Sequence, residues 1–127
     1  MTSTAPTQGR HPSSFIIYEG SGNFSRESLM VAPNQTLAAG QVVSMTVGHE
    51  SGLNEVTALD PGGTDGSQIA AGVVVHLVNL SPTTQKATIL AHRAEVRGSE
   101  LIWPVGISRV QQAAAVKQLE AVGILVK

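Results

Sequence analysis

The four histidines are the residues of this chain best suited to bind a transition metal, but their spacing argues against a metal site. His11, His49, His76 and His92 are scattered, and no two of them lie three or four residues apart. The chain has no cysteine, and a metal centre needs three or four ligands with supporting hydrogen bonds. Only His76 and His92 are expected to approach each other, because they lie on the two arms of an expected hairpin. We therefore expect ordinary strand histidines, no metal and no cofactor.

Two other segments share single features with catalytic motifs. Residues 62–66 (Gly-Gly-Thr-Asp-Gly) have the glycines of a phosphate-binding loop, but they lack the lysine of a P-loop and precede an expected strand rather than a helix. A turn is the better interpretation. Ser108 is flanked by Ile107 and Arg109, where a hydrolase nucleophile would sit in Gly-x-Ser-x-Gly. With no activated nucleophile and no general-base pair, we expect no catalytic residues and no enzyme.

The composition restricts the possible partners. The chain has a formal net charge of -1 and only 13% charged residues, so it lacks the basic surface that binds nucleic acid. No apolar run approaches the roughly 18 to 20 residues of a membrane span. The first residues lack the apolar core of a signal peptide, and the absence of cysteine fits synthesis in a reducing compartment. We expect a soluble protein made in the cytoplasm, with no nucleic-acid, membrane or small-molecule partner.

The length of 127 residues fits one domain behind a polar N-terminal arm. Residues 1–14 contain only Met1 and Ala5 as apolar residues, so this segment cannot fold alone. We expect a flexible arm over residues 1–14 and a single domain over residues 15–127. Because the chain has only four aromatic residues, the core must consist mainly of Val, Ile, Leu and Ala.

Short apolar and β-branched runs between clusters of turn-forming residues predict a mainly β domain. The segments 69–80 and 86–96, on either side of Ser81-Pro82-Thr83-Thr84, are expected to pair as a hairpin. Residues 15–18 are expected to form a strand or a docking segment, and the other expected strands are residues 27–32, 41–47, 54–59, 69–80, 86–96 and 124–126.

One helix is expected from about Arg109 to Val122. Ser108 and Gln111 match a capping box, and Gly123 stands where a left-handed cap ends a helix. The apolar residues at every third position are expected to form one buried stripe: Val110, Ala113, Val116, Leu119 and Val122. Before the helix, the single tryptophan, Trp103, is expected in the core or at a subunit contact.

Three segments, taken in order, resemble the protein D family of lambda-type phage head decoration proteins. They are Thr64-Asp65-Gly66 leading into Ala71-Gly72-Val73-Val74-Val75, then Glu100-Leu101-Ile102-Trp103-Pro104, then an Ala-rich helix that closes on residues 121–127 (Ala-Val-Gly-Ile-Leu-Val-Lys). Phe24-Ser25-Arg26-Glu27 and residues 37–43 extend the similarity to about residues 23–127.

The resemblance implies a β-clip fold with a helix, and a homotrimer that binds at the local and icosahedral three-fold positions of the expanded head. There it would cement the major capsid protein against internal DNA pressure on the outer surface of the virion. In such proteins the N-terminal segment faces the capsid and becomes ordered on binding. The resemblance places that role here on Thr2, Pro6, Arg10, His11, Pro12 and Phe15, and leaves structural roles to Trp103, Pro104, Ser108 and Gly123.

Two other protein classes fit the sequence less well. A trimeric β-clip enzyme of the dUTPase type would carry acidic and tyrosine-containing motifs at its subunit boundaries, and the sequence does not show them. A secreted ligand-binding β-domain would require a signal peptide.

Overall fold

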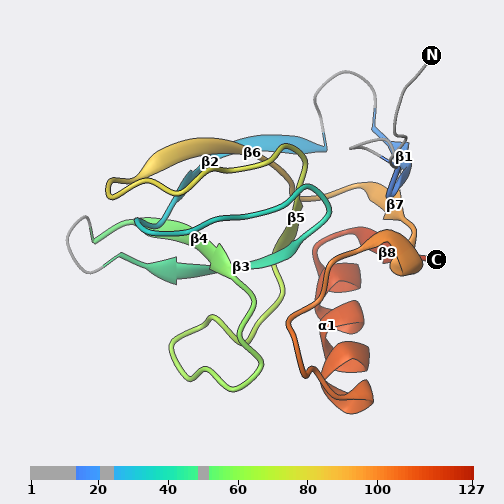
Figure 1. Cartoon of the computed structure of the whole chain (residues 1–127). Helices are drawn as coiled ribbons and strands as arrows, with labels where there is room; N and C mark the ends of the chain where they lie inside the picture. The colour runs from blue at the N-terminus through green and yellow to red at the C-terminus, as the bar shows by residue number, and fades with distance from the viewer. Residues whose placement is uncertain (1–13, 21–24, 49–51) are drawn as a thin grey trace.

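The computed structural model describes residues 14–20, 25–48 and 52–127 of the chain. The described part is mainly β with one C-terminal α-helix, as the sequence predicts. Five strands form a closed barrel in the order β2-β4-β3-β5-β6, and three form a separate sheet in the order β1-β7-β8, beside which α1 lies (Figure 1). The elements are β1 Ile16–Glu19, β2 Arg26–Val31, β3 Val42–Val47, β4 Asn54–Ala58, β5 Gly72–Val74, β6 Gln85–Leu90, β7 Ala94–Val96, a 3-10 turn at Gly98–Glu100, α1 Arg109–Ala121 and β8 Ile124–Val126.

The barrel has two long antiparallel pairs and one short seam. β2 pairs with β6 over its whole length, and β3 pairs with β4 over five residues. Closure between β2 and β4 rests on one parallel pair, Val31 with Val56, and on a 2.9 Å hydrogen bond from Ala32 N to Val56 O. Beyond the seam, the side-chain Oε1 of Gln35 accepts a hydrogen bond from Ala58 N. A side chain thus replaces the missing neighbour at this edge.

Apolar residues of the barrel wall contribute alternately to two cores. In β5, Val74 points into the barrel, while Val73 and the following Val75 point outward, toward α1 and the small sheet. All three are fully buried, which explains the uninterrupted apolar run in the sequence. The barrel core comprises Val31, Leu37, Val43, Val56, Val74, Val78 and Ile89. The interlayer core, between the barrel and the sheet with its helix, comprises Phe15, Val42, Leu59, Ala70, Val73, Val75, Leu90, Ala94, Val96, Leu101, Ala115, Leu119 and Ile124.

The predicted hairpin is confirmed in its pairing, but its arms were predicted too long. β5 pairs with β6 through Val73 with Leu90 and Val74 with Ile89, yet the strand expected over residues 69–80 is reduced to β5. The expected strand 86–96 is two strands in different sheets, β6 and β7. Arg93 adopts φ 51° between them. This left-handed residue turns the chain out of the barrel and into the small sheet.

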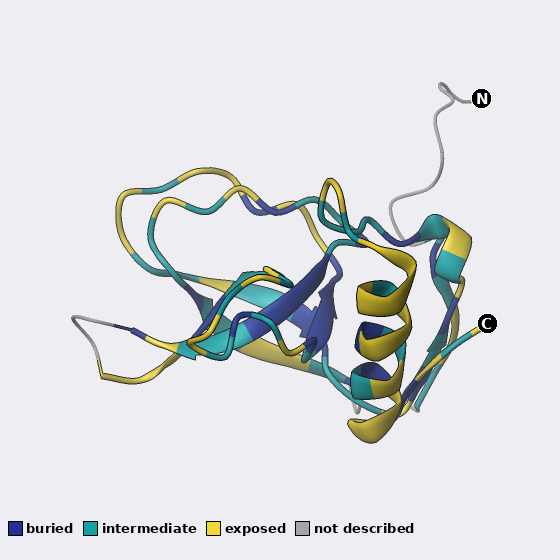
Figure 2. Ribbon diagram, turned by 90° about the horizontal axis from the view of Figure 1, so that it is seen from below, coloured by how far each residue is buried: buried dark blue, intermediate teal, exposed yellow. Residues whose placement is uncertain are grey.

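The helix and both of its caps are confirmed, whereas the predicted buried stripe was wrong. Ser108 Oγ accepts a hydrogen bond from Gln111 N, and Gln111 Oε1 accepts one from Ser108 N. The buried helical residues are Ala115 and Leu119, and Val110 is 81% exposed. Residues three apart are rotated by about 60° from one another, so five of them cover about 240° and cannot share one face. The outward turns of α1 are exposed in Figure 2.

Candidate functional site

The described chain begins at a fixed point on the end of the small sheet. Ser14 Oγ donates a hydrogen bond of 2.9 Å to Glu100 Oε1, and Ser14 O accepts one of 3.1 Å from Arg97 Nη1. One residue later, Phe15 O accepts a 2.7 Å hydrogen bond from Arg97 N. Any segment upstream of Ser14 is therefore attached to this end of the molecule. We call Ser14, Arg97 and Glu100 the arm root.

Phe15 belongs to the folded body and not to the arm. Its side chain is 1% exposed and lies in the interlayer core. The assignment of Phe15 to a capsid-binding arm is therefore corrected: its own domain covers the side chain, which is the largest of the fully buried side chains in the described residues. The other predicted arm residues, Thr2, Pro6, Arg10, His11 and Pro12, lie outside the described residues.

The C-terminus lies at the same end as the arm root. Lys127 N donates a 2.8 Å hydrogen bond to Val96 O, and Lys127 O accepts a 3.1 Å hydrogen bond from Gly98 N. Val96 and Gly98 flank Arg97, the residue that donates hydrogen bonds to the carbonyl oxygens of Ser14 and Phe15. The first and the last described residues, Ser14 and Lys127, thus lie at the same end of the small sheet.

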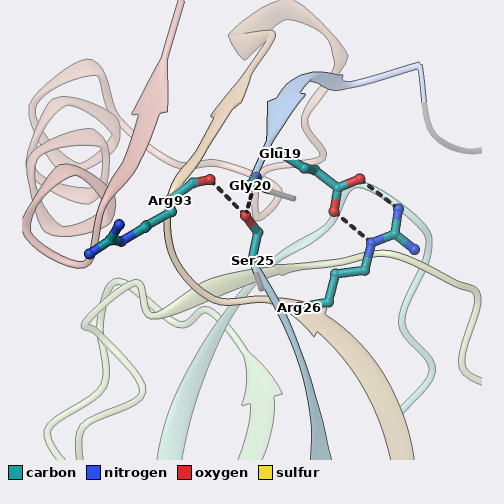
Figure 3. Close-up of polar contacts among 5 residues, drawn as sticks. All are labelled: Glu19, Gly20, Ser25, Arg26 and Arg93. Carbon is teal, nitrogen blue, oxygen red and sulfur yellow. Dashed lines mark hydrogen bonds and ion pairs between the residues drawn. The ribbon is translucent and has the colours of Figure 1, made fainter. Parts of the chain in front are cut away.

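A buried serine connects the small sheet to the barrel, as Figure 3 shows. Ser25 is 0% exposed, and its Oγ accepts a hydrogen bond from Gly20 N at 2.7 Å and donates one to Arg93 O at 2.7 Å. Gly20 follows β1 and Arg93 precedes β7, so both crossings between the two sheets meet at this hydroxyl. This role was not predicted, because a serine between two expected strands carries no signal of its three-dimensional partners.

An ion pair reinforces the same junction. The guanidinium of Arg26 donates hydrogen bonds to both oxygens of Glu19, at 2.6 and 2.8 Å. These hydrogen bonds to Glu19 raise the pKa of Arg26, against the opposing effect of burial and with the added attraction of the carboxylate charge. The pair joins the end of β1 to the start of β2 and keeps the arm-bearing strand in position.

Trp103 is only partly buried and packs at the border of the interlayer core. Its Nε1 is covered but has no hydrogen-bond partner. The following Pro104 accepts a hydrogen bond from Ile107 N, which closes the turn that leads to Ser108 and α1. At the other end of α1, Gly123 has φ 94°, and a Cβ there would lie 3.0 Å from Arg93 N. Ser108 and Gly123 therefore fix the two ends of the helix, while Trp103 is a border residue.

The described residues offer no metal cluster. No group of three or more His, Asp or Glu side chains that could hold a metal occurs among them. His92 Nε2 lies 3.4 Å from Glu27 Oε2, and His76 is exposed; His11 and His49 lie outside the described residues. In the same part of the chain, the structure contains no helix of the length and hydropathy needed to cross a membrane.

A comparison with protein-family models matches residues 5–124 of the chain to the bacteriophage lambda head decoration protein D family. The chain belongs to this family. The match covers both layers of the fold, including the arm root, the Ser25 junction and α1. A search of curated proteins finds no match. This protein D homologue is thus a phage head decoration protein, associated with the phage capsid, and its family is a structural one and not an enzyme family. The dUTPase alternative has no support from the match.

Proposed function

We propose that this decoration protein binds as a homotrimer to three-fold sites on the expanded head and stabilises it against internal DNA pressure. The protein is made in the host cytoplasm and resides on the outer capsid surface, with the major capsid protein as its partner. The observation that carries the proposal is the arm root, because it fixes where the N-terminal segment leaves the body. The contacts of Ser14 and Phe15 place that exit beside the C-terminus, on one end of the small sheet.

The segment upstream of the arm root is long enough to reach a capsid subunit. Residues 1–13 would span at most about 43 to 47 Å if fully extended, at about 3.3 to 3.6 Å per residue. A polar, extended segment of this kind can bind by adding a strand to an exposed sheet edge, with main-chain hydrogen bonds supplying the affinity. Its ordering opposes binding, so one arm alone binds weakly.

Trimerisation overcomes the weakness of a single arm. Three arms on one rigid body face three equivalent subunits at a three-fold site, so the second and third contacts form within one complex. Such linkage can raise the overall affinity by about 10² to 10⁴. The described surface supports self-association, because Val47, Leu53 and Val110 are each more than 60% exposed. Apolar side chains of this size gain stability when a second copy covers them.

Deletion of residues 2–13 tests the proposal. This variant keeps Ser14 and Phe15 with their hydrogen bonds, so we expect the wild-type trimer by analytical ultracentrifugation and a wild-type melting temperature. Expanded heads of the same phage, stripped of their decoration protein, would be sedimented with increasing amounts of each protein. We expect at least a hundredfold loss of affinity for the deletion variant, since all three arms are removed together.

Two results would contradict parts of this proposal. If the deletion variant bound with wild-type affinity, the capsid contact would lie on the folded body, and the arm would not be needed for binding. A wild-type protein that sediments as a monomer at micromolar concentration would refute the trimer.

A further inference from the structure

The small sheet has one face that the described chain leaves open. Across its three strands, Tyr18 of β1 pairs with Glu95 of β7, and Glu95 pairs with Leu125 of β8. Residues directly opposite one another in neighbouring strands point to the same side of a sheet. The alternate residues Ala94, Val96 and Ile124 lie in the interlayer core, so the row of Tyr18, Glu95 and Leu125 points outward.

This outer face is hollowed rather than flat. A shallow hollow of about 570 Å³ lies over it, and Tyr18 and Leu125 are 57% and 39% exposed. Two glycines, Gly20 and Gly123, widen the hollow because they carry no side chain, and Arg93 lies at its margin. An aromatic ring and an aliphatic side chain, with charged groups of both signs beside them, are typical of the centre and rim of a protein contact surface.

The position of the face specifies the occupant. Tyr18 follows Ser14 by four residues, so its backbone lies within about 14 Å of the arm root. The segment upstream of Ser14 leaves the body at this end, so a capsid subunit that it binds near its point of attachment lies on the side of the outer face. The outer face is therefore presented to whatever the arm binds.

We propose that the outer face of the β1-β7-β8 sheet is a second contact surface for the major capsid protein, separate from the N-terminal arm. This inference rests on the proposed function. The hollow between Tyr18 and Leu125 fits an extended capsid segment that places an apolar side chain between polar neighbours. The arm then supplies reach, and the face supplies a preformed contact that costs little ordering. The two surfaces act on the same subunit and are continuous through β1.

The test uses the full-length protein with Tyr18→Ser and Leu125→Ser together. Both side chains are exposed, so we expect the melting temperature and the sedimentation coefficient of the free protein to be unchanged. In the sedimentation assay with stripped expanded heads, we expect affinity to fall by about tenfold or more, as for apolar anchors at the centre of an interface. Tyr18→Phe keeps the ring and should retain wild-type binding. Leu77→Ser with Leu80→Ser, which changes two equally apolar exposed residues on the barrel, is the matched control and should bind as wild type.

Three outcomes overturn the inference. Unchanged affinity of the Tyr18 and Leu125 double variant would show that the face does not contact the capsid, and the arm deletion would still test the proposed function independently. Loss of self-association by the double variant would make the face an interface between copies of this chain. An equal loss of affinity in the Leu77 and Leu80 control would show that the effect is not specific to the face.

Discussion

The barrel and the small sheet differ in whether each has a hydrophobic core of its own. The barrel strands β2, β3, β4 and β6 have five or six residues, and their side chains enclose a core of their own. The small sheet has strands of only three or four residues, and its buried side chains pack against residues from the barrel wall, such as Val42, Val73 and Leu90. The buried face of this sheet is covered by the barrel wall, so the sheet depends on that packing for its stability. The small sheet, which carries the arm root, therefore depends on the barrel. The orientation of the arm is thus determined by the whole domain.

Phe15 is the side chain whose loss should disturb this dependence most. Phe15→Ala is expected to destabilise the protein by about 3 to 5 kcal/mol, the cost of removing a large side chain from a filled core. The measurement is chemical denaturation at fixed protein concentration, since association adds to apparent stability. Phe15→Leu keeps most of the volume and should cost clearly less. A loss below about 1 kcal/mol for Phe15→Ala would show that barrel and sheet are not joined through the interlayer core.

The next effect concerns the hydroxyl that joins the two regions. Ser25→Ala should cost about 1 to 3 kcal/mol, because the N–H of Gly20 and the C=O of Arg93 would lose a buried partner. Ser28→Ala, at an exposed position of β2, provides the matched control and should change stability by less than about 0.5 kcal/mol. Equal melting temperatures for the two variants would contradict the role of Ser25 as the connection between the sheets.

A smaller effect is expected at the start of α1, which covers the small sheet. Ser108→Ala removes the side-chain acceptor for Gln111 N and should cost about 0.5 to 2 kcal/mol. Ser108→Asp provides an equivalent acceptor and should restore most of the loss. Thermal melts of both variants measure the difference, and identical destabilisation by Asp and Ala would show that the capping hydrogen bond is unimportant.

The smallest effect is expected for the ion pair. Glu19→Gln removes the charge that Arg26 pairs with, but both side chains are about a quarter exposed, at 23% and 26%. Pairs near the surface contribute about 0 to 1 kcal/mol, and salt screens what remains. We expect a loss within that range that shrinks at 1 M salt. A loss that is larger than this range, or that does not depend on salt, would contradict the assignment of this ion pair to the weak, solvent-screened class.

Local chemistry made the helix and most strands predictable. Ser108 and Gln111 define the start of α1 through contacts within one turn, and Gly123 defines its end through a backbone angle that glycine adopts freely. The family resemblance was likewise visible in short segments such as Glu100-Leu101-Ile102-Trp103-Pro104 and was confirmed by the family match.

Features that depend on distant partners were not predictable from local patterns. Barrel closure rests on a single pair between Val31 and Val56, which no periodicity reveals. The division of the expected strand 86–96 depends on the left-handed turn at Arg93, an unusual conformation for a residue other than glycine. The burial of Phe15 was missed for the same reason: its place next to a polar segment suggested an arm, whereas the core that it fills is built from residues far along the chain, among them Leu119 and Ile124.

The most direct test of the account asks which end of the molecule faces the capsid. Because the chain has no cysteine, a single one can be introduced at Lys127 beside the arm root, or at Leu80 on the connection between β5 and β6. Labelling with a maleimide reagent would be followed for each variant in the free protein and on decorated heads. We expect that Lys127→Cys is labelled in the free protein and protected on heads, while Leu80→Cys keeps its rate of labelling. Protection of Leu80→Cys together with unchanged labelling of Lys127→Cys would show that the opposite end binds the capsid.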